Sequence, residues 1–240
     1  MSTYEIIKNT LSINNIEANE LQLNQLTRYY ELVVEYNKNI NLTAITEPYD
    51  FACKHFADSL LNYKYYKENS TLCDIGTGAG FPGIPLKILR PDLKVILVDS
   101  LQKRINFLNI VIKELNLSNI STIHSRAQEL TQNGVERESC DYIVSRAVAQ
   151  LNILSEFCLP FVTINGEMIA YKSTNTKNEI QLSKNALTEL GGEITQNTEY
   201  KLKHLLSNEL QTRNIISITK TKQTPTKYPR PKNKITTNPL

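Results

Sequence analysis

Four of the eight glycines of this 240-residue chain lie in the ten residues 74–83, which read DIGTGAGFPG. The stretch follows a short apolar run, 71–75, and precedes a run with helical spacing, 85–90, so it turns a strand into a helix. Glycines at such a turn let the backbone approach a ligand closely, where the N–H groups at the helix start are free. We therefore predict a cofactor site at this turn.

Two alignments of the glycines lead to different cofactors. Gly78, Gly80 and Gly83 match the G-x-G-x-x-G pattern of dinucleotide-binding proteins, but that alignment leaves Asp74 and Gly76 unexplained. The other alignment is an acid followed by Gly76-x-Gly78-x-Gly80. This pattern is the first motif of S-adenosylmethionine-dependent methyltransferases.

Two carboxylates help to choose between these cofactors. Asp99 ends the apolar run 94–99, where a carboxylate can accept hydrogen bonds from the ribose hydroxyls of either NAD or S-adenosylmethionine. Asp74 stands beside the glycines, which suits a cationic sulfonium ligand with a free amino group better than a pyrophosphate. The alternative role for Asp74 is to form the turn. We predict cofactor contacts for Asp74, Gly76, Gly78 and Asp99.

The residues after the run 140–145 indicate the acceptor of the methyl group. Enzymes that methylate the amino groups of bases typically have an Asn or Asp, two prolines and an aromatic residue here, whereas this chain has Ser145-Arg146-Ala147-Val148. An arginine only donates hydrogen bonds, so Arg146 suits a phosphate or a base acceptor. A ring nitrogen such as guanine N7 loses no proton on methylation, and alignment of the reactants then supplies most of the catalysis.

Two more polar residues are candidates for the substrate side of the site. His55 is expected either to contact RNA or to lie on a helix surface, and Lys172 either to meet a phosphate or to be an exposed strand-end lysine. No catalytic base is identified. The four cysteines have neither metal-ligand nor redox-pair spacing, so no metal is expected, and none of them follows a strand as cysteine-dependent carbon methylation would need.

The elements that position these residues form an α/β pattern. Short apolar runs alternate with amphipathic stretches, which predicts a parallel sheet with helices on both faces. Two further strands close the sheet as an antiparallel hairpin. We predict a seven-stranded, mostly parallel sheet of the Rossmann-like class I methyltransferase type. The expected strands are 71–75, 94–99, 121–125, 140–145, 166–173, 193–202 and 213–221, and the expected helices include 85–90, 103–116, 147–161 and 178–192.

Three regions follow along the chain: an N-terminal helical cap, 1–70, a methyltransferase domain, 71–220, and a C-terminal tail, 221–240. In the cap, Asn19 and Thr46 are expected to be the N-caps of helices. The tail contains prolines and is basic. From residue 219 onward there are six cations and no acids, so the rest of the chain has 21 Lys and Arg against 24 Asp and Glu.

This charge distribution suits a polyanion such as nucleic acid, although a solvated tail is the alternative. The chain start has no signal-peptide pattern, and no apolar stretch is long enough to span a membrane. We expect a cytoplasmic monomer with no membrane and no DNA partner.

Several segments together resemble one family, the bacterial small-subunit (16S) ribosomal RNA guanine-N7 methyltransferases, also known as glucose-inhibited division protein B. The most specific are NINLTAI, HFADSL and FPGIP, and the resemblance covers nearly the whole chain. The similar stretches are 36–45, 55–60, 74–88, 98–108, 125–130, 144–151 and 227–240.

The resemblance implies methyl transfer from S-adenosylmethionine to guanine N7 in 16S rRNA, either free or in the small ribosomal subunit. It implies a cofactor site that uses Gly76, Phe81, Ala127, Gln128 and Arg146, with the Phe81 ring packed on the cofactor and Ala127-Gln128 against adenine. The family usually has glutamate in place of Gln128, and its tail usually has a glycine that this chain lacks.

Two other functions stay open from the residues alone. The match of Gly78, Gly80 and Gly83 to the dinucleotide pattern allows an NAD-dependent oxidoreductase, although no general acid is spaced for hydride chemistry. The basic tail allows a non-catalytic RNA-binding module on the same fold.

Overall fold

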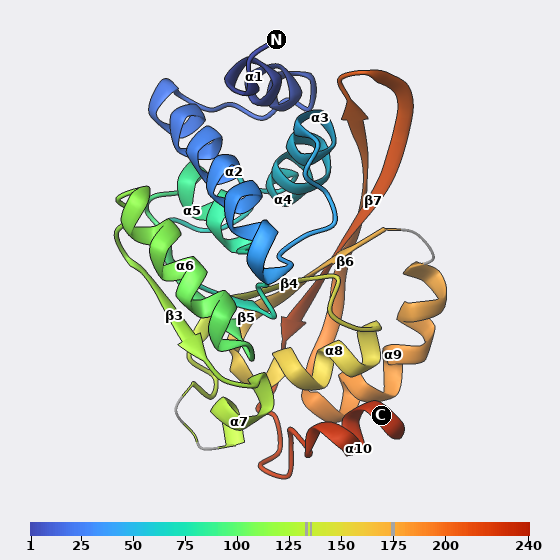
Figure 1. The fold of residues 1–240 in the computed structure, drawn as a ribbon. Coiled ribbons are helices and arrows are strands. Elements are labelled where there is room, and N and C mark those ends of the chain that lie inside the picture. Colours follow the sequence, from blue (N-terminus) through green and yellow to red (C-terminus); the bar gives the residue numbers. More distant parts are fainter. Residues whose placement is uncertain (133, 135, 174–175) are drawn as a thin grey trace.

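A seven-stranded sheet in the order β3-β2-β1-β4-β5-β7-β6 forms the centre of the computed structural model, which describes residues 1–132, 134, 136–173 and 176–240 (Figure 1). β1 to β5 are parallel, and β7 lies antiparallel between β5 and β6. The sequence-based prediction of this sheet is confirmed. The strands are β1 (Thr71–Ile75), β2 (Lys94–Asp99), β3 (Ile120–His124), β4 (Cys140–Arg146), β5 (Val162–Lys172), β6 (Gly192–His204) and β7 (Ser207–Lys220).

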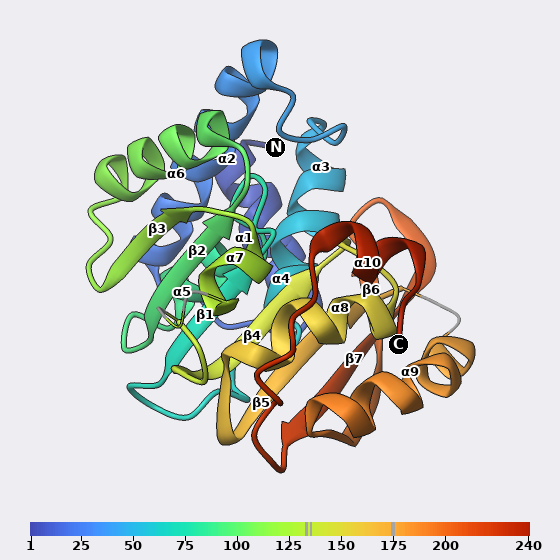
Figure 2. The ribbon, with the colours of Figure 1, turned by 90° about the horizontal axis from the view of Figure 1, so that it is seen from below.

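Successive residues of each central strand point to opposite faces of the sheet, and both sets are largely apolar. Helices therefore pack on both faces. α2, α5 and α6 lie on one face with the rest of the N-terminal helices, and α8, α9 and α10 lie on the other (Figures 1 and 2). The helices are α1 (Thr3–Ile13), α2 (Glu20–Ile40), α3 (Pro48–Phe51), the π-helical η1 (Ala52–Ala57), α4 (Asp58–Leu60), α5 (Gly83–Leu89), α6 (Gln102–Glu114), α7 (Ala127–Gln132), α8 (Leu151–Cys158), the 3₁₀-helical η2 (Leu159–Phe161), α9 (Thr176–Leu190) and α10 (Lys232–Thr237).

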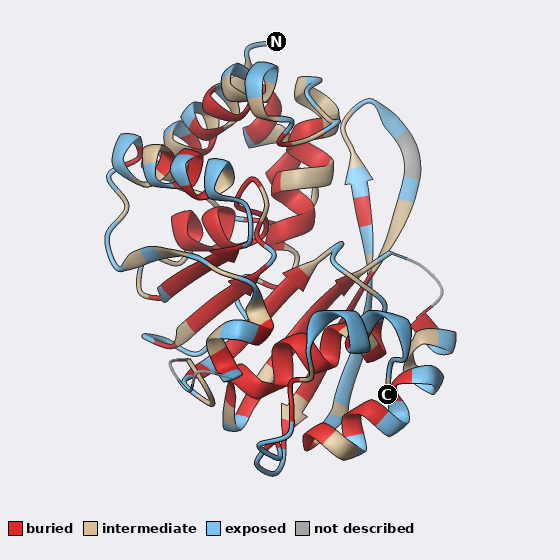
Figure 3. Ribbon diagram, turned by 60° about the horizontal axis from the view of Figure 1, so that its bottom comes forward, coloured by how far each residue is buried: buried red, intermediate tan, exposed pale blue. Residues whose placement is uncertain are grey.

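The alternation is visible in β1. Leu72 packs into the apolar cluster under the N-terminal helices, whereas Cys73 and Ile75 pack into the cluster under α8 and α9. Figure 3 shows that the central strands and the inward faces of the helices are buried, while the outer helix faces are exposed. The N-terminal helices share their core with the sheet, since Tyr29 of α2 is fully buried in the same cluster as Leu72.

The helix starts in the N-terminal region follow from local hydrogen bonding. Asn19 is the N-cap of α2, as predicted, and forms a reciprocal capping box with Gln22. The prediction for Thr46 is wrong. Glu47 is the N-cap of α3, because its longer side chain reaches the Asp50 N–H at 3.0 Å while Pro48 occupies the first helical position.

The hairpin of β6 and β7 extends beyond the sheet toward the N-terminal helices (Figure 1). Asn14 joins its far end to α1: its Nδ2 donates to the Lys203 carbonyl at 2.9 Å, and its Oδ1 accepts from the Lys203 N–H at 2.8 Å. These bonds tie the far end of the hairpin to the N-terminal helices.

Candidate active site

The glycine turn after β1 has a backbone that favours glycine. Gly76, Gly78 and Gly80 all have φ in the left-handed region, at +71°, +62° and +108°. A Cβ on Gly76 would lie 2.7 Å from Cγ2 of Val148, and one on Gly80 would lie 2.6 Å from the Tyr29 hydroxyl oxygen. Glycine is therefore needed here both for conformation and for close packing.

Asp99, at the end of β2, holds the glycine turn and the start of α6. Its Oδ2 accepts from the Gly78 N–H at 3.0 Å and from Arg104 Nη1 at 3.3 Å, and its Oδ1 accepts from the Leu101 N–H at 2.9 Å. A carboxylate has about four acceptor positions. One acceptor position of Asp99 is thus left for a ribose hydroxyl, whereas the sequence suggested bonds to both ribose hydroxyls.

A cavity of about 130 Å³ lies between the glycine turn and α7. The structure brings four predicted site residues together in its lining: Gly76, Asp99, Ala127 and Gln128. Gly78 adjoins them through its bond to Asp99. The volume is below the roughly 300–1,000 Å³ of pockets that enclose a whole ligand, so this cavity has room for only part of a cofactor.

Asp74 is fully buried beneath the turn. Its Oδ2 accepts from Thr77 Oγ1 at 2.8 Å and from the Gly83 N–H at 2.9 Å, which is the turn-forming role. Burial raises the pKa of this carboxyl to about 6. Its Oδ1 is also buried and has no hydrogen-bond partner within the described part of the chain.

The Phe81 ring packs within the protein. Its ring stacks on His55, with centroids 4.4 Å apart and planes 8° apart, and it also contacts Tyr29 and Phe51. Arg146 lies over the ring, with Cζ 5.2 Å from the centroid. The ring therefore links the glycine turn to the N-terminal helices, and its contact with a cofactor stays a prediction.

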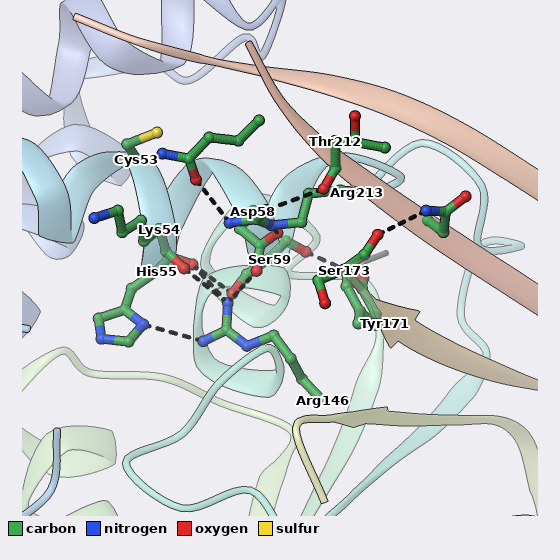
Figure 4. Close-up of polar contacts among 12 residues, drawn as sticks. Cys53, Lys54, His55, Asp58, Ser59, Arg146, Tyr171, Ser173, Thr212 and Arg213 are labelled. Atoms are coloured by element: carbon green, nitrogen blue, oxygen red, sulfur yellow. Dashed lines mark hydrogen bonds and ion pairs between the residues drawn. The ribbon is translucent and has the colours of Figure 1, made fainter. Parts of the chain in front are cut away.

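A second cavity, of about 420 Å³, opens at the carboxyl ends of β4 and β5. Arg146 enters it and is held by η1 and α4 (Figure 4): its Nη1 donates to Asp58 Oδ2 at 2.7 Å and its Nη2 to His55 Nδ1 at 3.2 Å. Arg213 of β7 donates from Nε to the other Asp58 oxygen at 2.8 Å. One carboxylate thus positions two guanidinium groups in the cavity.

His55 is a neutral ring in this arrangement. Arginine only donates, so Nδ1 is the acceptor and the ring proton is on Nε2, which lies 2.8 Å from Thr43 Oγ1. Burial and the nearby Arg146 charge lower the pKa of His55 to about 3. His55 is therefore neither a free helix-surface residue nor a base with an available lone pair.

Lys172 lines the same cavity but is paired. Its Nζ lies 2.6 Å from Glu179 Oε2 and donates to the Ala149 carbonyl at 2.7 Å. Among the lining residues that the structure describes, four are cationic and two are acidic, so the cavity has a net positive charge: Lys54, Arg146, Lys172 and Arg213 against Asp58 and Glu179. Such a lining favours a polyanionic substrate.

The loop after β4 contributes to both cavities. Ala147 lines the Arg146 cavity and Val148 lines the Asp99 cavity, and Ala147 has φ +59°. The loop therefore lies between the two cavities, directly over Gly76. Within the described residues, no cluster of three or more His, Cys, Asp or Glu could hold a metal ion, and none of the helices described could cross a membrane.

Three residues that line the 420 Å³ cavity were not predicted from the sequence: Asp58, Lys54 and Arg213. The signal for Asp58 was present, because it is the acid of the HFADSL segment, which already stood out as specific. Arg213 had no such signal, because it is a single arginine at the start of an expected strand. Only the antiparallel insertion of β7 beside β5 brings it to the site.

The sheet order, with antiparallel β7 between β5 and β6, and the acid and glycine turn after β1 define a class I methyltransferase that uses S-adenosylmethionine. Solved structures share the fold. A putative RNA methyltransferase from Pyrococcus horikoshii has TM-score 0.53 at 15% identity, covering 82% of this chain and 100% of that chain. TYW2 of M. jannaschii, solved with AdoMet, has TM-score 0.52 at 16% identity, covering 68% and 76%.

The chain belongs to the GidB family, whose model is described as rRNA small subunit methyltransferase G and matches residues 22–221. The ribosomal RNA small subunit methyltransferase G of Alkaliphilus metalliredigens is 45% identical over 232 residues, or 96% of this chain and 95% of the relative. That of Clostridium tetani is 43% identical over 242 residues and 100% of both chains. The family assignment confirms the resemblance and removes the oxidoreductase and non-catalytic alternatives.

Proposed function

We propose that this protein transfers a methyl group from S-adenosylmethionine to N7 of a guanine in small-subunit ribosomal RNA. One observation supports this acceptor above all: the 420 Å³ cavity at the carboxyl end of β4 presents Arg146, a pure hydrogen-bond donor. The lone pair of the neighbouring His55 Nδ1 is already occupied by that arginine. A ring nitrogen that keeps no proton at its reacting position fits such a site.

The residues around the glycine turn fit the cofactor. S-adenosylmethionine supplies an electrophilic methyl group on a sulfonium centre. Asp99 would accept from a ribose hydroxyl, and the Ala127-Gln128 segment would contact adenine, since both line the 130 Å³ cavity. The buried, unpartnered Oδ1 of Asp74 would accept from the amino group of the methionine part. Gly76, which has no side chain, would let that part approach the backbone of the turn closely.

The 420 Å³ cavity would receive the guanine. Arg146 would donate to an acceptor on the base or its phosphate, and Arg213 would contact the phosphate backbone. Both guanidinium groups are fixed by Asp58, so their orientation exists before RNA binds. The catalytic contribution of the chain is then alignment of N7 with the methyl group, without a general base.

The test is methyl transfer from labelled S-adenosylmethionine to small ribosomal subunits from a strain that lacks the gene. After nuclease digestion, the label is expected in 7-methylguanosine. Label in protein, in DNA or in another nucleoside would contradict the proposal. Free 16S rRNA assayed in parallel tells whether the assembled particle is required.

A ribosomal substrate also implies a cytoplasmic enzyme that needs no DNA or membrane partner. We further propose that the protein acts as a monomer, since both cavities are formed by residues of a single chain. Sedimentation of the purified protein tests this.

A further inference from the structure

The C-terminal tail is packed against the cofactor side of the molecule. Tyr228 and Ile235 are buried, at 5% and 0% exposure, in the same apolar cluster as α8 and α9. α10 lies against α8 (Figure 2). The basic tail is thus not a solvated end, and its residues have defined positions next to the methyltransferase domain.

An ion pair fixes the segment just before α10. Arg230 donates from Nε to Glu156 Oε1 at 2.9 Å and from Nη2 to Oε2 at 2.7 Å, and its backbone N–H donates to Oε1 at 2.8 Å. Glu156 is on α8 and is 1% exposed. Gln132 of α7 adds a bond from Nε2 to the Pro229 carbonyl at 2.8 Å. The chain is therefore held from two helices at residues 229 and 230.

Two residues after Arg230, at Lys232, the tail reaches the 130 Å³ cavity. Lys232 lines the 130 Å³ cavity together with Asp99, Arg126 and Gln128, and the other lining residues described lie between 75 and 157. A neighbouring cavity of about 530 Å³ between α7 and α10 is lined by Arg126, Gln128 and Lys232 as well. Lys232 thus lies next to the place where an adenine ring bound at Gln128 would be exposed to solvent.

We propose that α10 forms the outer wall of the adenosine site, that Lys232 is a further cofactor-binding residue, and that the Arg230–Glu156 pair positions it. The proposal rests on the assignment of S-adenosylmethionine to the 130 Å³ cavity. Lys232 is exposed, so its ammonium group is free to donate to a ring nitrogen or ribose oxygen of adenosine. Its aliphatic stem would cover the ring.

The test is calorimetry of S-adenosylhomocysteine binding to the full chain, without RNA. Lys232→Glu and Lys232→Ala are expected to raise Kd about three- to tenfold, as for the loss of one hydrogen bond. The matched control is Lys234→Ala, which removes an exposed lysine from the same short helix and should leave Kd unchanged. Arg230→Lys keeps the charge but loses the bidentate contact with Glu156, and it should raise the Kd of S-adenosylhomocysteine as well.

Thermal unfolding of each variant separates folding from binding. Because Lys232 is exposed, its variants are expected to keep the wild-type melting temperature. A wild-type Kd for S-adenosylhomocysteine in both Lys232 variants would overturn the proposal. An equal rise in Kd in Lys234→Ala would also overturn it, because the effect would then come from net charge. This assay contains no methyl acceptor, so its result is independent of whether guanine N7 is the target.

Discussion

Arg146 and Asp58, 88 positions apart in the chain, form an ion pair of 2.7 Å at the carboxyl end of β4. The same carboxylate also binds Arg213, and both arginines face the 420 Å³ cavity. The side chains are largely buried, at 9% exposure for Asp58, 13% for Arg146 and 21% for Arg213. Through this shared acid, the N-terminal helices contribute to the 420 Å³ cavity as well as to the core.

The first prediction concerns this acid. Asp58→Asn keeps the shape but removes the charge between two guanidinium groups, so we expect kcat to fall at least tenfold and the free energy of unfolding by about 1–3 kcal/mol, less than for a fully buried pair. The control for stability is Asp50→Asn, which breaks the pairs of the 40%-exposed Asp50 with Lys54 and His204 and should change stability by less than about 1 kcal/mol. Wild-type kcat/KM in Asp58→Asn would refute the positioning role.

The second prediction separates the two roles of Asp74. In Asp74→Asn the amide oxygen can still accept from Thr77 and Gly83, but the other carboxylate oxygen is replaced by a donor. We expect the Kd of S-adenosylmethionine to rise about tenfold or more. Methylthioadenosine lacks the amino acid part, so its Kd should stay unchanged. An equal rise in the Kd of both ligands would show that Asp74 only shapes the turn.

The third prediction concerns Gly76. Gly76→Ala places a Cβ 2.7 Å from Val148 and forces alanine into φ +71°. The control is Gly134→Ala, which has a similar φ of +74°, and among the described residues no atom beyond its chain neighbours lies within 4 Å of the added Cβ, so it tests strain without a clash. Both should lose about 1–2 kcal/mol of stability from backbone strain. Only Gly76→Ala should weaken cofactor binding, and calorimetry of both variants with S-adenosylhomocysteine checks this.

The fourth prediction is a pH dependence. The pKa of His55 is about 3 in the folded protein against 6.5 for a free imidazole, so between these values the unfolded chain binds a proton that the folded chain does not. The contribution of His55 to stability is therefore complete above about pH 6.5 and decreases as the pH falls toward 3. NMR of the rings, assigned with His55→Asn, should show no titration of His55 between pH 5 and 8. A titration midpoint of His55 near pH 6.5 would contradict the conclusion that the ring is buried and neutral.

The fifth prediction tests Arg213 as an RNA contact. Arg213→Gln should weaken rRNA binding and reduce the slope of log K against log salt by about one unit. Lys201→Gln, on the exposed part of the same hairpin, is the control, since its ammonium group pairs with Glu199 at 2.6 Å and lies outside the lining of the cavity. An unchanged slope in Arg213→Gln would remove this residue from the RNA-binding surface.

The sheet could be predicted because its signals are local. Short apolar runs, glycines and Asp99 at strand ends specify strands and turns without long-range information. Every expected strand is present, although β5 begins four residues and β7 six residues earlier than expected. Ala127 and Gln128 could be named only from the family resemblance, since nothing in the segment SRAQEL itself indicates a ligand.

The pairings of charged groups could not be predicted. Asp58 and Arg213 are 155 positions apart, and the composition of either segment does not indicate the other. The same holds for the tail, where composition gives six cations but not their partners. Lys220 is fully buried against Glu138, and Arg230 is bound to Glu156, so neither is available to phosphates as the charge count suggested.

The most direct test of the account is a crystal structure of the protein with S-adenosylhomocysteine. We predict adenine beside Gln128 and Lys232, the ribose at Asp99, and the amino group at Asp74 Oδ1, with the sulfur directed toward the Arg146 cavity. A ligand bound with its adenosine in the Arg146 cavity, or with its amino group away from Asp74, would contradict the division of the site into a cofactor side and an acceptor side.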